Sequence, residues 1–115
     1  MKQMSKILLA ASLLALTTPS FAKVTPIKFA KGSYCGSFSG NYAGRTFTLG
    51  LGAGQTLEIR NRYANPIVRD PKGRKVYHEA GSEWVYFIKT KGTYKITLHP
   101  FGNEGTYDNI TFCAY

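Results

Sequence analysis

The stretch RTFTLGLGAGQTLEIR, residues 45–60, shows the clearest structural pattern in the chain. Apolar and polar residues alternate in residues 45–51 and again in residues 55–60, with apolar positions at Phe47, Leu49, Leu51, Leu57 and Ile59. Alternation with a period of two predicts β-strands that bury one face and expose the other. Gly52, Ala53 and Gly54 interrupt the pattern. They predict a glycine-rich turn rather than a phosphate-binding loop, because no helix follows them.

The same strand pattern continues on both sides of this stretch. We expect further strands, separated by glycine-rich breaks, at residues 34–40, 66–70, 75–79, 83–88, 93–98 and 107–114. Residues 83–88 (EWVYFI) are apolar at both parities, which predicts a strand that is buried on both sides. Strands this short and frequent, without helical periodicity, predict an all-β fold. We expect an antiparallel two-sheet β-sandwich, with a closed barrel as the alternative.

The first 22 residues have the three parts of a secretory signal peptide. Lys2 and Lys6 form a positively charged start, residues 7–16 (ILLAASLLAL) form an apolar core, and small residues at Ser20 and Ala22 suit a cleavage site. As a helix the apolar run spans roughly 15 Å, about half of a hydrocarbon core, so we expect no membrane span. We therefore expect residues 23–115 to form a single domain in the periplasm or outside the cell.

Cys35 and Cys113 are the only cysteines in the chain. An even count in an exported protein favours a disulfide bond. A metal site is the alternative, but only His78 and His99 could add imidazole ligands, and neither lies at a ligand-like spacing. Both cysteines share the polar parity of their strands. We therefore expect the first and last long strands to be neighbours in one sheet, with the bridge on or near its outer face.

The expected domain is strongly basic. Of the 15 Lys and Arg, Lys2 and Lys6 fall in the signal peptide, so the domain keeps 13 against 6 Asp and Glu and has a net charge of +7. Such a surface attracts acidic proteins, lipopolysaccharide or anionic glycans through its long-range field, or simply keeps the protein soluble. Basic and aromatic residues interleave at residues 60–63 and 89–95, but no RNA-recognition or OB-fold signature accompanies them, so we do not expect nucleic acid as a partner.

No arrangement of reactive residues predicts catalysis. The two histidines and six carboxylates do not form the pattern of nucleophile, base and orienting group that a catalytic site needs. Ser37 and Ser39 lie in GSFSG, residues 36–40, which lacks the strand-to-helix context of a nucleophile elbow. We therefore expect a binding protein that is not an enzyme and that uses no cofactor and no metal.

Several short motifs become informative through their order and spacing. They are FAKG at 29–32, the strand ending in SG at 34–40, GAGQTLEI at 52–59, PIVRDPKGRKV at 66–76, WVYF at 84–87 and GTYKITL at 92–98. This order resembles the inhibitors of g-type lysozyme, small periplasmic members of the bacterial pre-peptidase C-terminal-like β-sandwiches. The resemblance implies a jelly-roll-like sandwich without a cofactor. It also implies a lysozyme partner, of the g-type, whose glycan-binding cleft the protein plugs.

The resemblance also implies a partner-binding site. In the family an S-G-x-Y motif lies in a loop that meets the enzyme, and its positions here match Lys91, Gly92, Thr93 and Tyr94. Lysine replaces the serine, and a lysine beside a tyrosine anchor suits a cleft lined with carboxylates. Two residues of the loop expected at 99–105 complete the candidate site, namely His99 and Asn103. The alternative function is a non-catalytic envelope module that recognises a glycan or an anionic surface.

Overall fold

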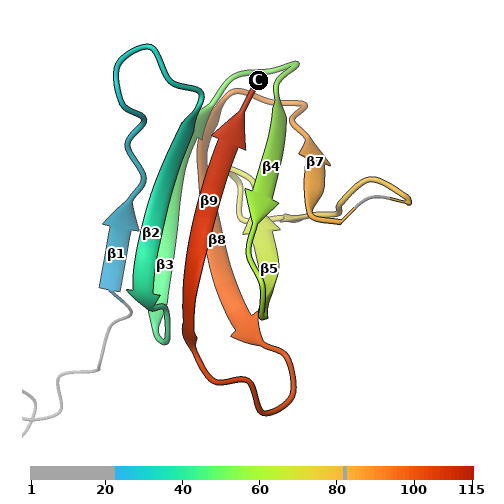
Figure 1. The fold of residues 1–115 in the computed structure, drawn as a ribbon. Coiled ribbons are helices and arrows are strands. Elements are labelled where there is room, and N and C mark those ends of the chain that lie inside the picture. Colours follow the sequence, from blue (N-terminus) through green and yellow to red (C-terminus); the bar gives the residue numbers. More distant parts are fainter. Residues whose placement is uncertain (1–22, 82) are drawn as a thin grey trace, which may run out of the picture.

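Nine β-strands form the described part of the chain, residues 23–81 and 83–115 of a computed structural model (Figure 1). They are β1 (Lys23–Pro26), β2 (Cys35–Asn41), β3 (Arg45–Leu51), β4 (Thr56–Arg60), β5 (Ala64–Arg69), β6 (Lys75–Val76), β7 (Val85–Phe87), β8 (Gly92–Pro100) and β9 (Tyr107–Ala114). Within these residues no helix is long and apolar enough to cross a membrane. The predicted signal peptide, residues 1–22, lies outside the described residues.

The strands form two sheets that pack face to face (Figure 1). The first sheet has the order β1-β3-β8-β5-β6 and the second has the order β2-β9-β4-β7. All paired strands run antiparallel except β1 and β3, which run parallel. The predicted two-sheet, all-β sandwich is confirmed. The parallel edge strand β1 was not expected, because its four residues show too little alternation to stand out.

The glycine-rich turn after β3 carries the chain from one sheet to the other, because β3 belongs to the first sheet and β4 to the second. Gly54 has a φ of +90°, a conformation that glycine adopts without steric cost. The Gln55 side-chain oxygen accepts a hydrogen bond from the Gly52 amide at 2.7 Å, which closes the turn. The turn therefore joins the two layers of the sandwich instead of closing a hairpin.

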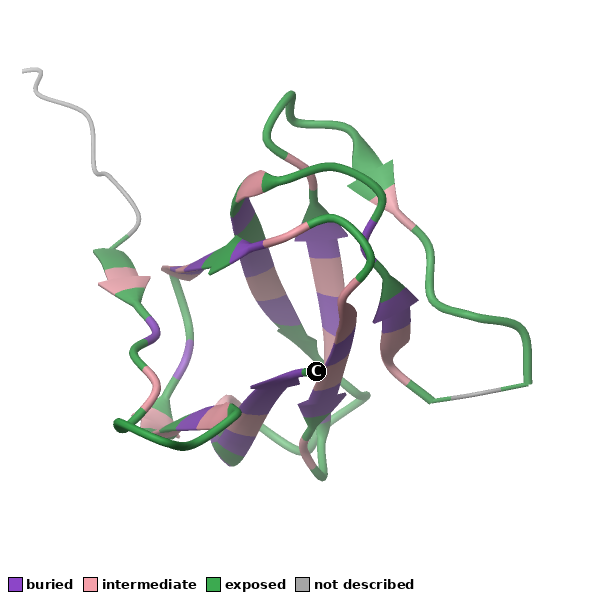
Figure 2. Cartoon of the chain, turned by 90° about the horizontal axis from the view of Figure 1, so that it is seen from above, coloured by how far each residue is buried: buried purple, intermediate pink, exposed green. Residues whose placement is uncertain are grey.

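The core lies between the sheets and is built from alternate residues of their strands. Figure 2 shows this as buried bands crossing the strands, with exposed residues gathered in the loops. The Phe47 ring of the first sheet contacts the Phe112 and Phe38 rings of the second, with centroids 5.3 and 5.0 Å apart. Burial of the apolar residues predicted to face inward in residues 45–60 is confirmed, and Phe47 and Leu57 among them are fully buried. Ile96, Ile110 and Phe112 of the later strands are fully buried as well.

The strand predicted at residues 83–88 differs from its expectation. β7 covers only Val85–Phe87 and forms the edge of its sheet, so it is not buried on both sides. Tyr86 and Ile88 face the core, whereas Phe87 is 46% exposed. The predicted return strand at 75–79 is also shorter, because residues beyond Val76 leave β5 and approach β7, where the Glu79 amide donates to the Val85 carbonyl.

The disulfide joins Cys35 of β2 to Cys113 of β9, which are directly opposite each other with Cα atoms 4.1 Å apart. The predicted pairing of these strands in one sheet is confirmed. Cys113 is nonetheless fully buried, although it has the outward parity. Glu58 lies opposite it on β4 and is held in a hydrogen-bonded group with Arg60 and Tyr115, which covers this part of the outer face.

Removing the bridge with Cys35→Ala and Cys113→Ala together should lower the free energy of unfolding by about 4 kcal/mol, because the bridge closes a long loop in the unfolded chain. The joined residues are 78 positions apart. Urea denaturation of the oxidised protein and the double variant, followed by the fluorescence of Trp84, measures the difference. A loss below about 1 kcal/mol would contradict this role for the bridge.

Candidate binding site at the turn between β7 and β8

The turn at residues 88–91, between β7 and β8, contains the first of the candidate site residues and is held by its neighbours. The Ile88 amide donates to the Gln55 carbonyl at 2.9 Å, and the Ile88 carbonyl accepts from the Gly54 amide at 2.8 Å. The glycine-rich stretch that links the two sheets therefore also fixes the start of this turn.

Gly92 ends the turn where the backbone comes closest to a second turn. Its φ is +149°, which side chains rarely adopt, and a Cβ at this position would collide with the Pro71 ring. Pro71 belongs to the turn at residues 70–73, where the Gly73 amide donates to the Asp70 carbonyl at 2.8 Å. Glycine is therefore required here by the backbone and by the close approach of the two turns.

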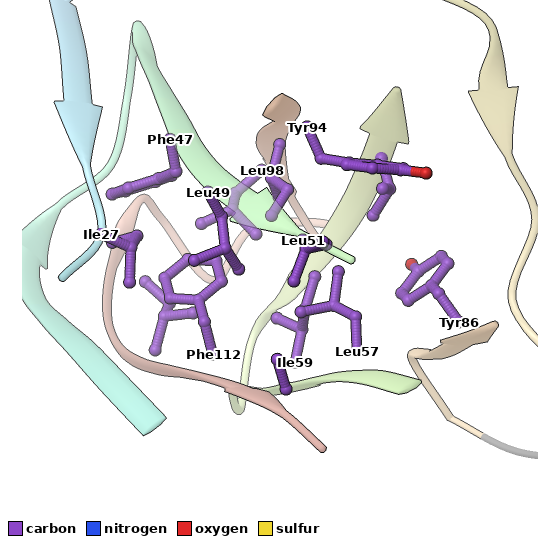
Figure 3. Close-up of a cluster of buried hydrophobic side chains, with 14 of the residues drawn as sticks. Ile27, Phe47, Leu49, Leu51, Leu57, Ile59, Tyr86, Tyr94, Leu98 and Phe112 are labelled. Carbon is purple, nitrogen blue, oxygen red and sulfur yellow. The ribbon is translucent and has the colours of Figure 1, made fainter. Parts of the chain in front are cut away.

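Tyr94 supports the turn from inside the sandwich. Its side chain is 1% exposed, and its ring lies at the margin of the core, beyond Leu51 in the direction of Tyr86 (Figure 3). Its hydroxyl donates to the Thr90 carbonyl at 2.6 Å. Lys91 and Thr93, by contrast, are exposed. Of the four motif positions, then, Gly92 and Tyr94 shape the turn, while Lys91 and Thr93 face solvent.

A pocket of about 430 Å³ opens beside the turn, between the edge strands β6 and β7. Its lining includes two exposed aromatic rings, Tyr77 and Phe87, and two lysines, Lys75 and Lys89. The Lys75 ammonium lies 5.0 Å from the centre of the Tyr77 ring, a cation–π contact. The carboxylates of Asp70 and Glu79 also line it, so the pocket is aromatic and carries charges of both signs. Sequence reasoning missed the pocket because much of it is formed by loops whose paths no periodicity predicts.

Hydrogen bonds to Asp70 fix the shape of the adjacent turn. Its carboxylate accepts hydrogen bonds from the amides of Arg74 and Lys72, each at 2.9 Å, and pairs with the Arg74 guanidinium at 3.2 Å. The Arg74 amide contributes most to holding the pKa of this carboxyl below its usual range. Asp70 is therefore ionised and keeps Pro71 in place against Gly92.

His99 and Asn103 do not lie near this turn. β8 begins at Gly92 and His99 lies seven residues further on, about 23 Å away at about 3.3 Å per residue. The loop that contains Asn103 follows β8 at the opposite end of the sandwich (Figure 1). His99 lies in a strand rather than the expected loop, and it lines a smaller pocket of about 290 Å³. The six candidate residues therefore belong to two separate surfaces.

Asp108 organises that opposite end, and sequence reasoning did not single it out. It is 9% exposed and accepts hydrogen bonds from the amides of Tyr63 at 2.8 Å and Arg62 at 3.1 Å, which shapes the turn between β4 and β5. Burial, together with the negative charge of Asp108, raises the pKa of Tyr42. The sequence did contain one signal for the burial of Asp108: it lies two residues before Ile110 and therefore points to the same, inward side of the strand.

The described residues contain no group of three or more His, Cys, Asp or Glu side chains that could hold a metal ion. Both cysteines are used by the disulfide. Nothing in residues 23–81 and 83–115 therefore supports the metal-site alternative.

Fold and site together define a small disulfide-linked β-sandwich with a rigid, basic turn and an adjoining aromatic pocket. No family model and no curated protein matches the sequence. Among solved structures, the fold is similar to that of PliG, a periplasmic lysozyme inhibitor of g-type lysozyme, from Salmonella Typhimurium. The TM-score is 0.63 at 17% identity, covering 81% of this chain and 98% of that chain.

Two further solved structures show the same likeness. PliG from Aeromonas hydrophila has a TM-score of 0.57 at 21% identity, covering 81% of this chain and 96% of that chain. A mutant of PliG from Escherichia coli has a TM-score of 0.58 at 18% identity, covering 82% and 99%. At these identities the likeness shows the fold, and it confirms the fold that the sequence resemblance implied.

Gly92→Ala should destabilise the protein by about 1–3 kcal/mol, because alanine meets both an unfavourable φ and the Pro71 ring. Gly50→Ala is the matched control, since Gly50 has open space around it and a φ that other residues accept. Thermal denaturation of both variants measures the difference. Equal melting temperatures for the two variants would show that the two turns do not constrain each other.

Asp70→Asn should make the stability of the protein depend less on pH in the acidic range. The lowered pKa of Asp70 means that its charge stabilises the fold above about pH 4, and that this contribution is lost as the pH falls through the lowered value. Melting temperatures measured from about pH 6 down to about pH 2.5 should therefore decline more steeply for the wild type than for the variant. Parallel curves would contradict the assignment.

Proposed function

We propose that this protein is an exported inhibitor of g-type lysozyme and that it acts by binding rather than by catalysis. The observation that carries the proposal is the extent of the structural likeness. The three inhibitors are covered over 96–99% of their own chains, with TM-scores of 0.57–0.63. The described domain thus matches nearly the full length of each of these inhibitors.

The turn between β7 and β8 supplies the contacts with the enzyme. Its exposed side chains are Lys89, Thr90 and Lys91, and the exposed Thr93 follows at the start of β8. A glycosidase cleft holds a pair of catalytic carboxylates. Lysine ammonium groups that enter such a cleft form charge-assisted hydrogen bonds with carboxylates, which are stronger than neutral ones. Occupation of the cleft by the turn excludes the glycan substrate.

Rigidity of the turn favours this mechanism. It is fixed by the Ile88 backbone bonds, by the contact of Gly92 with Pro71 and by the Tyr94 hydroxyl. A loop that is already ordered loses less conformational entropy on binding, so more of the contact energy appears as affinity. Tyr94 is therefore a positioning residue in this proposal, and Lys89, Lys91 and Thr93 are the contact residues.

The positive charge of the domain selects among targets. A net charge of +7 repels a strongly cationic enzyme at long range and slows association with it. We expect the preferred lysozyme to be one whose surface around the cleft is neutral or acidic. The same field keeps the domain in the negatively charged environment of the bacterial envelope.

The proposal is tested by lysis of cell-wall suspensions. Purified residues 23–115 should inhibit a g-type lysozyme at near-stoichiometric ratios. Lys91→Glu should raise the inhibitor concentration needed by at least tenfold, because it places a carboxylate against carboxylates. Lys23→Glu is the matched control: it makes the same charge change at the far end of the sandwich, where the Lys23 amide bonds to Gly44.

The variant Tyr94→Phe tests the positioning role of Tyr94 separately from the residues that contact lysozyme. It keeps the buried ring and removes only the hydroxyl that holds Thr90, so inhibition should weaken several-fold through faster dissociation while the fold is retained. The absence of inhibition of g-type lysozyme at large excess would overturn the proposal. Inhibition of c-type or i-type enzymes alone would overturn the choice of target.

A further inference from the structure

The first sheet of the sandwich has an unusual charge distribution. Its five strands contain five cationic residues and no aspartate or glutamate: Lys23, Arg45, Arg69, Lys75 and Lys95. Both carboxylates that lie in strands, Glu58 and Asp108, belong to the second sheet. Arg69, Lys75 and Lys95 project from the outer face of this sheet, whereas Arg45 shares the inward parity of Phe47 and its guanidinium lies over the Phe38 ring of the second sheet. The turn proposed to bind lysozyme lies at the end of this outer face.

Three of these cations stand in register across neighbouring strands. Arg69 of β5 is paired with Lys75 of β6 on one side and with Lys95 of β8 on the other, and all three are exposed. The Cβ atoms of such directly opposed residues lie about 4.5–5.5 Å apart, and like charges in this position destabilise a sheet. The Arg69 guanidinium donates one hydrogen bond to the Gly73 carbonyl at 3.1 Å. The other N–H groups of Arg69 remain available to a ligand.

The row of cations leads directly to the pocket between β6 and β7. Lys75 is its last member and also lines that pocket, where its ammonium group lies over the exposed Tyr77 ring. Phe87 and Lys89 line the same pocket, as do Glu79 and Asp70, whose carboxylate pairs with the Arg74 guanidinium. A ligand that follows the row therefore meets three successive positive charges and then an exposed aromatic surface.

We infer that this face binds an acidic polysaccharide whose sugar rings carry carboxylate groups. The carboxylates pair with Lys95, Arg69 and Lys75, and the apolar face of one sugar ring packs on Tyr77. The outward residues beside the row are Thr48, Ile67, Thr93 and Thr97, without an aromatic ring, whereas single-stranded nucleic acid is bound by repeated stacking platforms. Membrane insertion would require projecting apolar residues, and of these neighbours only Ile67 is apolar.

The row of cations is distinct from the contact residues of the proposed lysozyme site, although Lys89 of that site lines the same pocket as Lys75. Arg69 and Lys95 lie on the sheet face, outside the turn at residues 88–91. Binding of a polysaccharide along the row leaves Lys91, which does not line the pocket, accessible and holds the protein within the envelope. Loss of one activity need not change the other, so the two proposals can fail separately.

The test uses polygalacturonate as the ligand and the double variant Arg69→Gln/Lys95→Gln. Wild-type residues 23–115 should bind at low salt and lose affinity as salt rises, because screening shortens the field to about 8 Å at physiological ionic strength. The variant should bind at least tenfold more weakly. Lys28→Gln/Lys31→Gln is the matched control, because it removes the same charge from exposed positions in the β1–β2 loop, and it should bind within threefold of wild type.

Two further measurements keep the inference open to refutation. The double variant should melt at the same temperature as wild type or higher, since it relieves repulsion between opposed cations. Tyr77→Ala should weaken binding of polygalacturonate but not of inorganic polyphosphate, which has no sugar ring. Equal losses in the double variant and its matched control, equal effects of Tyr77→Ala on both polymers, or stronger binding to anionic lipid vesicles or single-stranded DNA than to polygalacturonate would each overturn the inference.

Discussion

Contact between the inner faces of the two sheets is the interaction on which the remaining structure depends. It centres on Phe47 and Phe112, whose rings lie 5.3 Å apart across the layers and are both fully buried. A buried side chain of this kind contributes about 1.5–3 kcal/mol, and a one-residue slip of a strand would turn its whole apolar set towards water. The register fixed by this core sets the two cysteines opposite each other and aligns the cations of the outer face. It also determines where each strand ends and each turn begins.

This dependence explains which parts of the molecule the sequence predicts. Period-two alternation identifies which face of a strand is buried, so β3 and β9 have their predicted bounds and the inward residues are correct. Alternation does not say which strand lies beside which, so the passage from β3 to β4 between sheets was not predictable. The edge position of β7 was missed for the same reason, because an apolar strand has the same sequence pattern at the centre and at the edge of a sheet. Cys35 and Cys113 were the exception, because a covalent bond requires proximity.

In the candidate site, too, the structural role of a residue and its position in the fold are separate questions. Gly92 and Tyr94 are explained by the construction of the turn, through the contact with Pro71 and the hydrogen bond to Thr90. Both residues therefore have a structural role that requires no partner, whereas Lys91 beside them is exposed and is a contact residue only in the proposed function. His99 and Asn103 seemed close to the motif in sequence, but strand β8 carries the chain to the opposite end of the sandwich.

The proposed function requires that the rigid turn between β7 and β8 is the surface that meets lysozyme. Hydrogen–deuterium exchange of residues 23–115, measured alone and in complex with a g-type lysozyme, tests it most directly. We expect the complex to protect the amides of residues 89–93 and to leave those of the β8–β9 loop, including Asn103, unchanged. Protection confined to the β8–β9 loop and the neighbouring turn at residues 60–64 would contradict the claim and place the interface at the other end of the sandwich.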